Sequence, residues 1–201
     1  TAQPPEAITI WDRPYPLHVA ETELSGRTDL LTYLQMVDQG QVTRGKRTRL
    51  LTAASVRKVL ANLMDGDFHP EPEKVTGRTV IRPFGLDVFT QHAGLVTRTG
   101  KLTAAGRTYL QTQDSDVFLD AFEQWAEKGR FDELARITQL NGQNARKTLL
   151  TPPAGRREKI IEALSWCPAH TWLAITDFYR AVMIWQFDFD VEKTEWSNLH
   201  A

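Results

Sequence analysis

Cys167 and His170 are the residues whose types and spacing come closest to a nucleophilic catalytic pair. A histidine near a thiol can act as its base, but a third group must orient the histidine. The sequence supplies no such group, and the neighbours Trp166 and Pro168 are apolar. Because free cysteine is commonly buried, we interpret Cys167 as structural and expect no catalytic residues and no enzymatic activity.

Metal chemistry has two weak candidates. The five histidines lack the spacing of metal ligands such as His-x-x-x-His. An acidic loop surrounds His69, and a pair of aspartates lies further on, at Asp188 and Asp190; a solvated loop and the solvent side of a strand are the simpler interpretations. We therefore expect no metal and no cofactor. The absence of a Gly-x-x-x-x-Gly-Lys-[Ser/Thr] phosphate loop excludes ATP hydrolysis by this chain.

Basic side chains gather in two segments, and they could neutralise nucleic-acid phosphates. Residues 42–58 contain six basic and no acidic side chains, and two more follow at 98 and 101. The candidate phosphate contacts are Arg44, Lys46, Arg47, Arg49, Arg57, Lys58, Arg98 and Lys101, and the candidate base-reading residues are Thr90, Gln91 and His92. The alternative is a solvated basic loop without a ligand. Asp87, on the helix that would enter the groove, is expected to repel phosphate.

Composition sets the limits of this hypothesis. The chain has 201 residues, 41% hydrophobic and 24% charged, and a formal net charge of −1, so no overall field attracts nucleic acid or an anionic membrane. A single cysteine excludes an intramolecular disulfide and indicates a reducing compartment. The apolar runs are too short to span a bilayer. We expect a cytoplasmic protein without membrane contact, and the opening Thr1 favours a fragment of a longer protein.

Apolar spacing predicts a mainly α fold with small β elements, in two modules. An extended, proline-containing lead occupies residues 1–24, because proline disfavours regular helix. A winged-helix domain is expected over 25–112 and a second helical, winged-helix-like domain, truncated before its wing, over 113–201. Helical periodicity and capping residues predict helices at 28–38, 53–64, 83–93, 104–110, 115–127, 131–140, 156–166 and 176–185. Strands are expected at 41–43, 172–175 and 185–191.

The most specific feature is the segment from Gly94 to Thr103. Gly94 ends a helix, Leu95-Val96 and Lys101-Leu102-Thr103 are expected to form two short strands, and Gly100 permits the turn between them. A further helix follows with Ala104-Ala105-Gly106-Arg107. This order of elements predicts a helix-turn-helix relative whose hairpin is the wing.

This segment resembles the wing and following helix of many bacterial winged-helix proteins. The second half adds Arg156-Arg157-Glu158-Lys159-Ile160-Ile161-Glu162-Ala163-Leu164, followed by Pro168, Trp172, Ile175 and Phe178. That order is similar to the helicase-associated N-terminal region of XPB-type helicases. The resemblance implies a non-enzymatic accessory region in a DNA transaction.

Two partners remain open at this point. The first is double-stranded DNA, bound by the basic loop and the wing. The second is a protein partner, or the rest of a longer chain, with the protein acting as an interaction scaffold without nucleic-acid contact. The scaffold hypothesis predicts an exposed apolar patch near Phe187, Phe189 and Trp196. A loop Arg44–Arg49 that folds toward the wing would favour the DNA hypothesis.

Overall fold

The chain is mainly α-helical in the computed structural model, which describes residues 7–10, 12–16, 22–67, 75–76, 79–136, 150–169, 171–184, 189 and 191. These residues form seven α-helices, one short 3-10 helix and two short strands. The chain divides into two compact units, Glu21–Gly129 and the combination of Thr1–Ala20 with Arg130–Ala201. We call the first the helical unit and the second the terminal unit.

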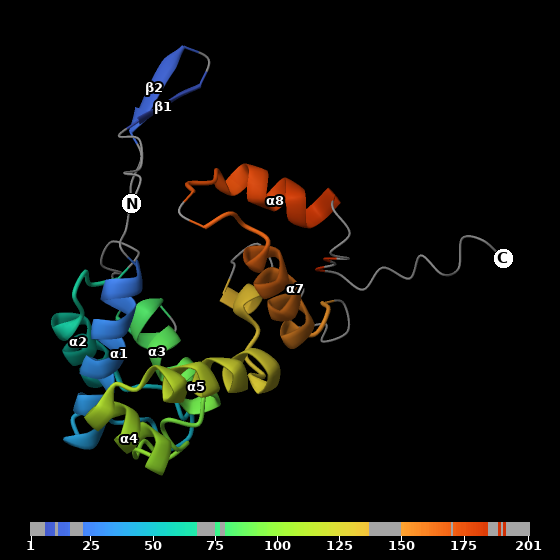
Figure 1. Cartoon of the computed structure of the whole chain (residues 1–201). Helices are drawn as coiled ribbons and strands as arrows, with labels where there is room; N and C mark the ends of the chain where they lie inside the picture. Colours follow the sequence, from blue (N-terminus) through green and yellow to red (C-terminus); the bar gives the residue numbers. More distant parts are fainter. Residues whose placement is uncertain are drawn as a thin grey trace. The chain divides into compact units, whose positions relative to one another are not determined.

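Five helices make up the helical unit: α1 (Thr22–Asp38), α2 (Ala53–Asn62), α3 (Arg82–His92), α4 (Ala104–Thr112) and α5 (Ser115–Lys128). Helix α1 contacts α2, α3 and α4, and α5 contacts α3 and α4 (Figure 1). Each helix therefore buries one face against at least two others, which is the arrangement that an amphipathic stripe requires.

One continuous apolar core fills this unit. Its fully buried members include Tyr33 and Leu34 from α1, Val56 and Val59 from α2, and Leu95 after α3. Burial of each such side chain contributes on the order of 2 kcal/mol. The core continues into α5, where Phe118 packs at ring-centroid distances of 6.5 Å from Phe89 and 6.0 Å from Tyr109.

Capping residues fix several of the helix ends as the sequence predicts. The Thr52 side chain accepts a hydrogen bond from the Ser55 amide at 3.3 Å at the start of α2. Gly40, with φ of 68°, lies in the left-handed region just beyond α1. Helix α1 begins at Thr22 rather than near Thr28. Apolar spacing does not reveal this earlier start, because the first turns are largely exposed and carry no apolar stripe.

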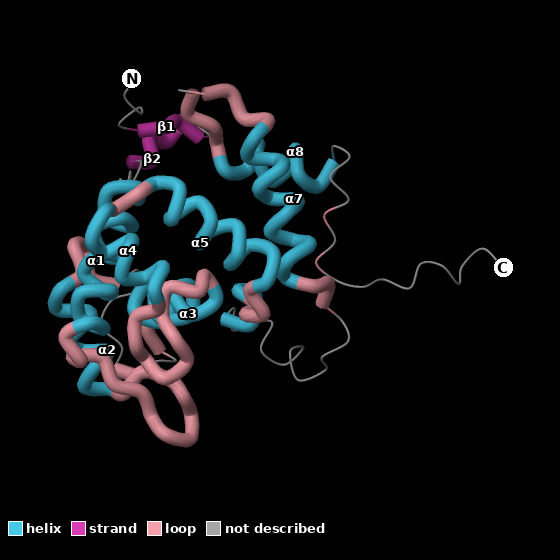
Figure 2. The backbone as a smooth tube through the Cα atoms, turned by 60° about the horizontal axis from the view of Figure 1, so that its bottom comes forward, coloured by secondary structure: helices cyan, strands magenta, loops and turns pink. Residues whose placement is uncertain are grey.

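The strands predicted in this part of the chain are not formed. The strand expected at 41–43 and the hairpin expected at 95–103 are each reduced to one antiparallel bridge, Arg44 with Leu51 and Val96 with Leu102. Figure 2 shows loops, not strands, between the helices of this unit. In each segment the backbone hydrogen bonds are mainly local, so each bridge stays single and does not extend into a pair of strands.

The terminal unit has a smaller core. Strands β1 (Ala7–Ile10) and β2 (Arg13–Pro16) pair antiparallel, which gives the lead a regular structure that the sequence did not predict. A 3-10 helix, η1 (Glu133–Arg136), precedes α7 (Pro153–Ser165) and α8 (Ile175–Ile184). Ala163 and Val182 are the buried pair between α7 and α8.

Three predictions in the terminal unit have different outcomes. The strand expected at 172–175 is not formed: residues 171–174 have no regular structure, and α8 begins at Ile175. The helix expected at 131–140 is a 3-10 turn where it is described. The strand expected at 185–191 lies outside the described residues apart from Phe189 and Val191.

The division between the units differs from the predicted one. Helix α5 was expected to open the second module at residue 113, but it packs on α3 and α4, and the first unit continues to Gly129. Phe89 of α3 lies 5.8 Å from Trp125 of α5, between ring centroids. The apolar face of α5 is thus part of the first core. None of the helices in the described part of the chain is both long and apolar enough to cross a membrane.

Candidate nucleic-acid interface

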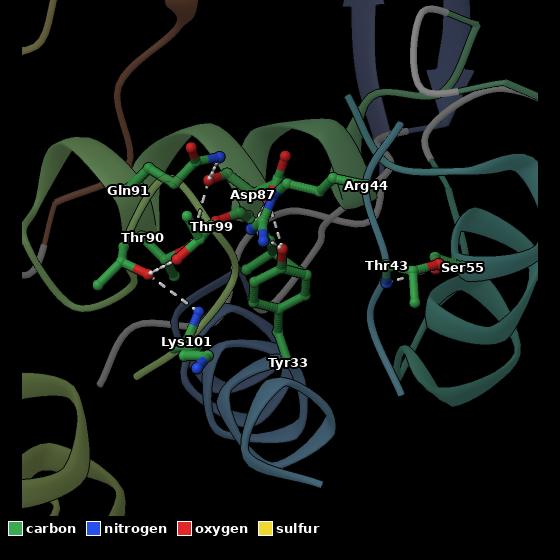
Figure 3. A network of polar contacts seen from close by, with 11 residues as sticks. Tyr33, Thr43, Arg44, Ser55, Asp87, Thr90, Gln91, Thr99 and Lys101 are labelled. Atoms are coloured by element: carbon green, nitrogen blue, oxygen red, sulfur yellow. Dashed lines mark hydrogen bonds and ion pairs between the residues drawn. The ribbon is translucent and has the colours of Figure 1, made fainter. Parts of the chain in front are cut away.

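Arg44 lies at the centre of a buried polar network. Its guanidinium forms an ion pair with Asp87 of α3, and its side chain and that of Asp87 are 5% and 3% exposed. The Tyr33 hydroxyl donates to the same carboxylate oxygen at 2.6 Å, and Arg44 Nη2 donates to that hydroxyl at 3.3 Å. Figure 3 shows the three side chains converging from α1, the loop after it and α3.

This network is held inside the protein rather than offered to a ligand. Burial of the ring, with Asp87 as the next cause, raises the pKa of the Tyr33 hydroxyl well above its ordinary value. Tyr33 is therefore a neutral donor at physiological pH. Arg44 was predicted to contact phosphate and Asp87 to repel it; both are instead neutralised by each other in the core, and Arg44 leaves the set of candidate phosphate contacts.

Arg44 also joins the basic loop to the turn after α3. A Cβ added to Gly100 would lie 2.1 Å from Arg44 Nη1, so the guanidinium is packed directly beneath that turn. Nη1 itself is buried without a hydrogen-bond partner. The loop 45–50 and the turn 97–101, far apart in the sequence, are thereby brought together, which is the arrangement that favours the DNA hypothesis.

Both segments are closed by their own hydrogen bonds. In the basic loop the Gly45 amide donates to the Leu50 carbonyl at 2.9 Å, and the Arg49 amide donates to the Gly45 carbonyl at 2.8 Å. In the turn the Thr97 amide donates to the Lys101 carbonyl at 2.8 Å, and Lys101 N donates to Thr97 Oγ1 at 3.1 Å. The backbone of each segment thus presents its side chains from a defined conformation.

Seven of the predicted cations are exposed, and none of the seven forms an ion pair with any described residue. Three lie in the basic loop, two on α2 and two in the turn. They are Lys46, Arg47, Arg49, Arg57, Lys58, Arg98 and Lys101. An unpaired exposed cation can neutralise a phosphate without first breaking an internal contact, so these side chains suit an anionic partner.

The polar residues predicted on α3 are mostly turned inward. Thr90 is fully buried, and its hydroxyl donates to the Leu86 carbonyl at 2.8 Å, so it does not reach a DNA base. The Gln91 amide donates to the Asp87 carbonyl at 3.0 Å, and both Gln91 and His92 are half-buried. Of the three predicted base-reading residues, only Gln91 and His92 have accessible side chains.

Three positioning features were missed in the sequence. A Cβ on Gly106 would lie 2.1 Å from the Leu95 carbonyl oxygen, so glycine allows α4 to approach the segment after α3. The Asp67 carboxylate accepts hydrogen bonds from the Ile81 and Arg82 amides at 3.1 and 2.8 Å and caps α3. Arg82 forms a buried ion pair with Asp29. The sequence shows Asp67 as an acidic residue, but the two amides that it binds lie 14 and 15 residues further along the chain.

Of the remaining candidates, His69 in the acidic loop lies outside the described residues, and the others are in the terminal unit. The Cys167 thiol donates to the Ala163 carbonyl at 3.5 Å, while His170 lies outside the described residues, as do Asp188 and Asp190. Arg156 and Arg157 are buried and pair with Asp132 and Glu133 at 2.5 and 2.6 Å. These arginines connect η1 to α7 and leave no free guanidinium for a ligand.

Comparison of the chain with protein-family models, with curated proteins and with solved structures finds no match in any of the three.

Proposed function

We propose that the helical unit is a winged-helix module that binds the phosphate backbone of double-stranded DNA without catalysing a reaction. The observation that carries this proposal is the contact of Arg44 with Gly100, which joins the basic loop to the turn after α3. Five exposed cations, Lys46, Arg47, Arg49, Arg98 and Lys101, then belong to two adjoining segments.

The order of elements supports the winged-helix assignment. Helix α1, the bridge at Arg44, the pair α2 and α3, and the turn 97–101 occur in the order of a helix-turn-helix domain followed by a wing. In this assignment the turn is a minimal wing, closed by the single bridge of Val96 with Leu102. Arg57 and Lys58 on α2 extend the cationic surface.

The proposed binding mode is sequence-independent. Contacts to phosphate position a protein on DNA, whereas contacts to base edges specify the sequence. Helix α3 uses Asp87 and Thr90 internally and has one basic residue near its start, Arg82, which pairs with Asp29. The exposed cations, by contrast, lie in the loop, in the turn and on α2, where they can contact phosphates.

A labelled DNA duplex titrated with protein at several salt concentrations tests this proposal. We expect the logarithm of the association constant to fall linearly with the logarithm of salt, by about 0.9 for each phosphate neutralised. Replacing Arg98 and Lys101 by alanine should reduce that slope by about 2 and weaken binding roughly tenfold at moderate salt.

The matched control removes two exposed cations elsewhere, Lys128→Ala on α5 with Arg130→Ala just after it. It changes the net charge equally, so it should leave the slope nearly unchanged. Equal losses in both double variants would mean that net charge alone drives binding and would refute the assigned surface. Unchanged binding after Arg98→Ala with Lys101→Ala would refute the role of the turn.

A second candidate function is a protein-interaction scaffold, and one observation favours it. Large apolar side chains are exposed on α7 and α8 of the terminal unit. The patch differs from the predicted one: Phe189 packs against the small core, and Phe187 and Trp196 lie outside the described residues. A scaffold of this kind, or an accessory region of a helicase system, is compatible with DNA binding by the other unit.

A further inference from the structure

Helices α7 and α8 each carry more apolar surface than their mutual contact uses. Phe178 and Val182 of α8 pack toward Ile160 and Ala163 of α7. On α8 a second apolar row, Ile175, Tyr179 and Met183, runs at spacings of four residues beside the first. The two helices are both coloured orange to red in Figure 1.

The second row is open to solvent. Ile175 is 77% exposed, Tyr179 is 60% and Met183 is 49%, and on α7 Leu164 is 54% exposed. Ile161, Leu173 and the two tryptophans at 166 and 172 are also large apolar residues with exposed side chains. In the helical unit, by comparison, the exposed large apolar side chains among the described residues are Leu24, Met64 and Leu119.

The size of this surface matches an interface. Eight large apolar side chains, each between 38 and 77% exposed, expose on the order of 1,000 Å² if a large side chain presents about 200 Å² in full. A stable interface of standard size takes about 800 Å² from each partner.

The charges around the patch allow a second copy of the chain to approach. Arg180 and Asp177 lie 3.8 Å apart on α8, and Lys159 and Glu162 lie 3.6 Å apart on α7, so each helix carries one pair of opposite charges beside its apolar residues. The whole chain has a formal net charge of −1. Two copies therefore meet little like-charge repulsion, and a two-fold interface can place each acid opposite a base.

We infer that the apolar rows of α7 and α8 bind the same rows of a second copy, and that the chain is a homodimer through a four-helix contact. A pair of helices with a core as small as Ala163 and Val182 gains its missing apolar neighbours from the identical pair. The dimer carries two helical units and therefore two copies of the cationic surface.

Sedimentation equilibrium over a range of micromolar concentrations tests this inference on the whole chain. The wild-type chain is expected to sediment as a dimer. Replacement of Ile175 and Tyr179 by glutamate should raise the dimer dissociation constant at least 100-fold, because four charges would be buried without partners in the symmetric contact. Helical circular dichroism should be unchanged, since both side chains are already exposed.

The control is Leu24→Glu with Leu119→Glu, two leucines of the helical unit that are each 52% exposed. It adds the same charge and should remain dimeric. The single change Leu164→Glu on α7 is a second test should the double variant lose helix content, and it should also weaken the dimer.

A wild-type chain that is monomeric at all concentrations would overturn the inference, whether the face then binds another protein, a lipid surface or the helical unit. A dimer that persists in both glutamate variants, or is lost equally in the control, would also overturn it. The DNA titration is independent of these outcomes, because the Arg98→Ala with Lys101→Ala variant keeps the apolar rows intact.

Discussion

At the scale of single residues, glycine has opposite roles at two helical positions. Gly106 of α4 lies against the Leu95 backbone, where a Cβ would be 2.1 Å from the carbonyl oxygen, whereas a Cβ on Gly85 of α3 would meet nothing within 4 Å. Gly106→Ala should lower the free energy of unfolding by about 2 kcal/mol or more, because backbone must shift. Gly85→Ala should raise it by about 0.5–1 kcal/mol through helix propensity.

Chemical denaturation of the two variants checks this pair of predictions. Alanine has the same size and the same helix propensity at both positions, so each variant is the control for the other. A stabilising or neutral Gly106→Ala would contradict the close contact between α4 and the segment after α3.

Tyr33 links a single hydroxyl to the pH dependence of stability. Burial raises the pKa of Tyr33 in the folded state, while tyrosine in the unfolded chain ionises near pH 10. Its contribution is therefore complete below about pH 10 and is lost as the pH rises above it. Tyr33→Phe removes the 2.6 Å hydrogen bond to Asp87 and should destabilise the protein by about 1–3 kcal/mol at neutral pH.

The same variant should lose less stability than the wild type between about pH 9 and 11. Unfolding free energies measured across this range give the comparison. Tyr179→Phe, which removes the hydroxyl of an exposed ring, is the control for the loss of a tyrosine hydroxyl as such. An identical alkaline decline in wild type and Tyr33→Phe would exclude Tyr33 as its cause.

At the scale of elements, Thr103 connects the turn to the helix that follows. Its hydroxyl accepts from the Gly106 amide at 3.0 Å, which caps α4, and donates to the Gly94 carbonyl at 2.7 Å. Thr103→Ala should destabilise the protein by about 1–2 kcal/mol. Thr103→Ser keeps both bonds and should recover most of this loss; denaturation of the two variants provides the measurement, and equal losses would argue against the cap.

Helices were predictable where apolar spacing and a capping residue agree. Thr52 and the stripe through Val56 and Val59 predict α2 closely, and Ser115–Lys128 follows its stripe. The start of α1 was missed because its first turns are mostly exposed. The strands failed because two or three alternating residues do not show whether a neighbouring strand will extend their pairing.

The candidate site was only partly predictable for a similar reason. Sequence spacing identified the exposed cations of the loop and turn, but it could not separate Arg44 from Lys46, Arg47 and Arg49. Arg44 is buried because Asp87, 43 residues away, pairs with it, and no local pattern contains that information. The cap that Asp67 forms on the Ile81 and Arg82 amides was equally unpredictable, because these partners are distant in the sequence.

At the scale of the whole molecule, the two units differ in the size of their apolar cores and in the kind of side chain that they expose. The helical unit has the large core and the exposed cations, while the described part of the terminal unit has Ala163 and Val182 as its buried apolar residues and carries the apolar rows of α7 and α8. The boundary at Gly129 could not be predicted because α5 is amphipathic whichever unit receives its apolar face.

The salt dependence of duplex binding tests the central claim most directly. Titration of a labelled duplex should give a steep, linear loss of affinity with salt in the wild type. Arg47→Ala with Arg49→Ala, and separately Arg98→Ala with Lys101→Ala, should each reduce the slope by about 2, because the loop and the turn both contact phosphates. Duplex binding without salt dependence, or equal slopes in the wild type and both double variants, would contradict the proposed interface.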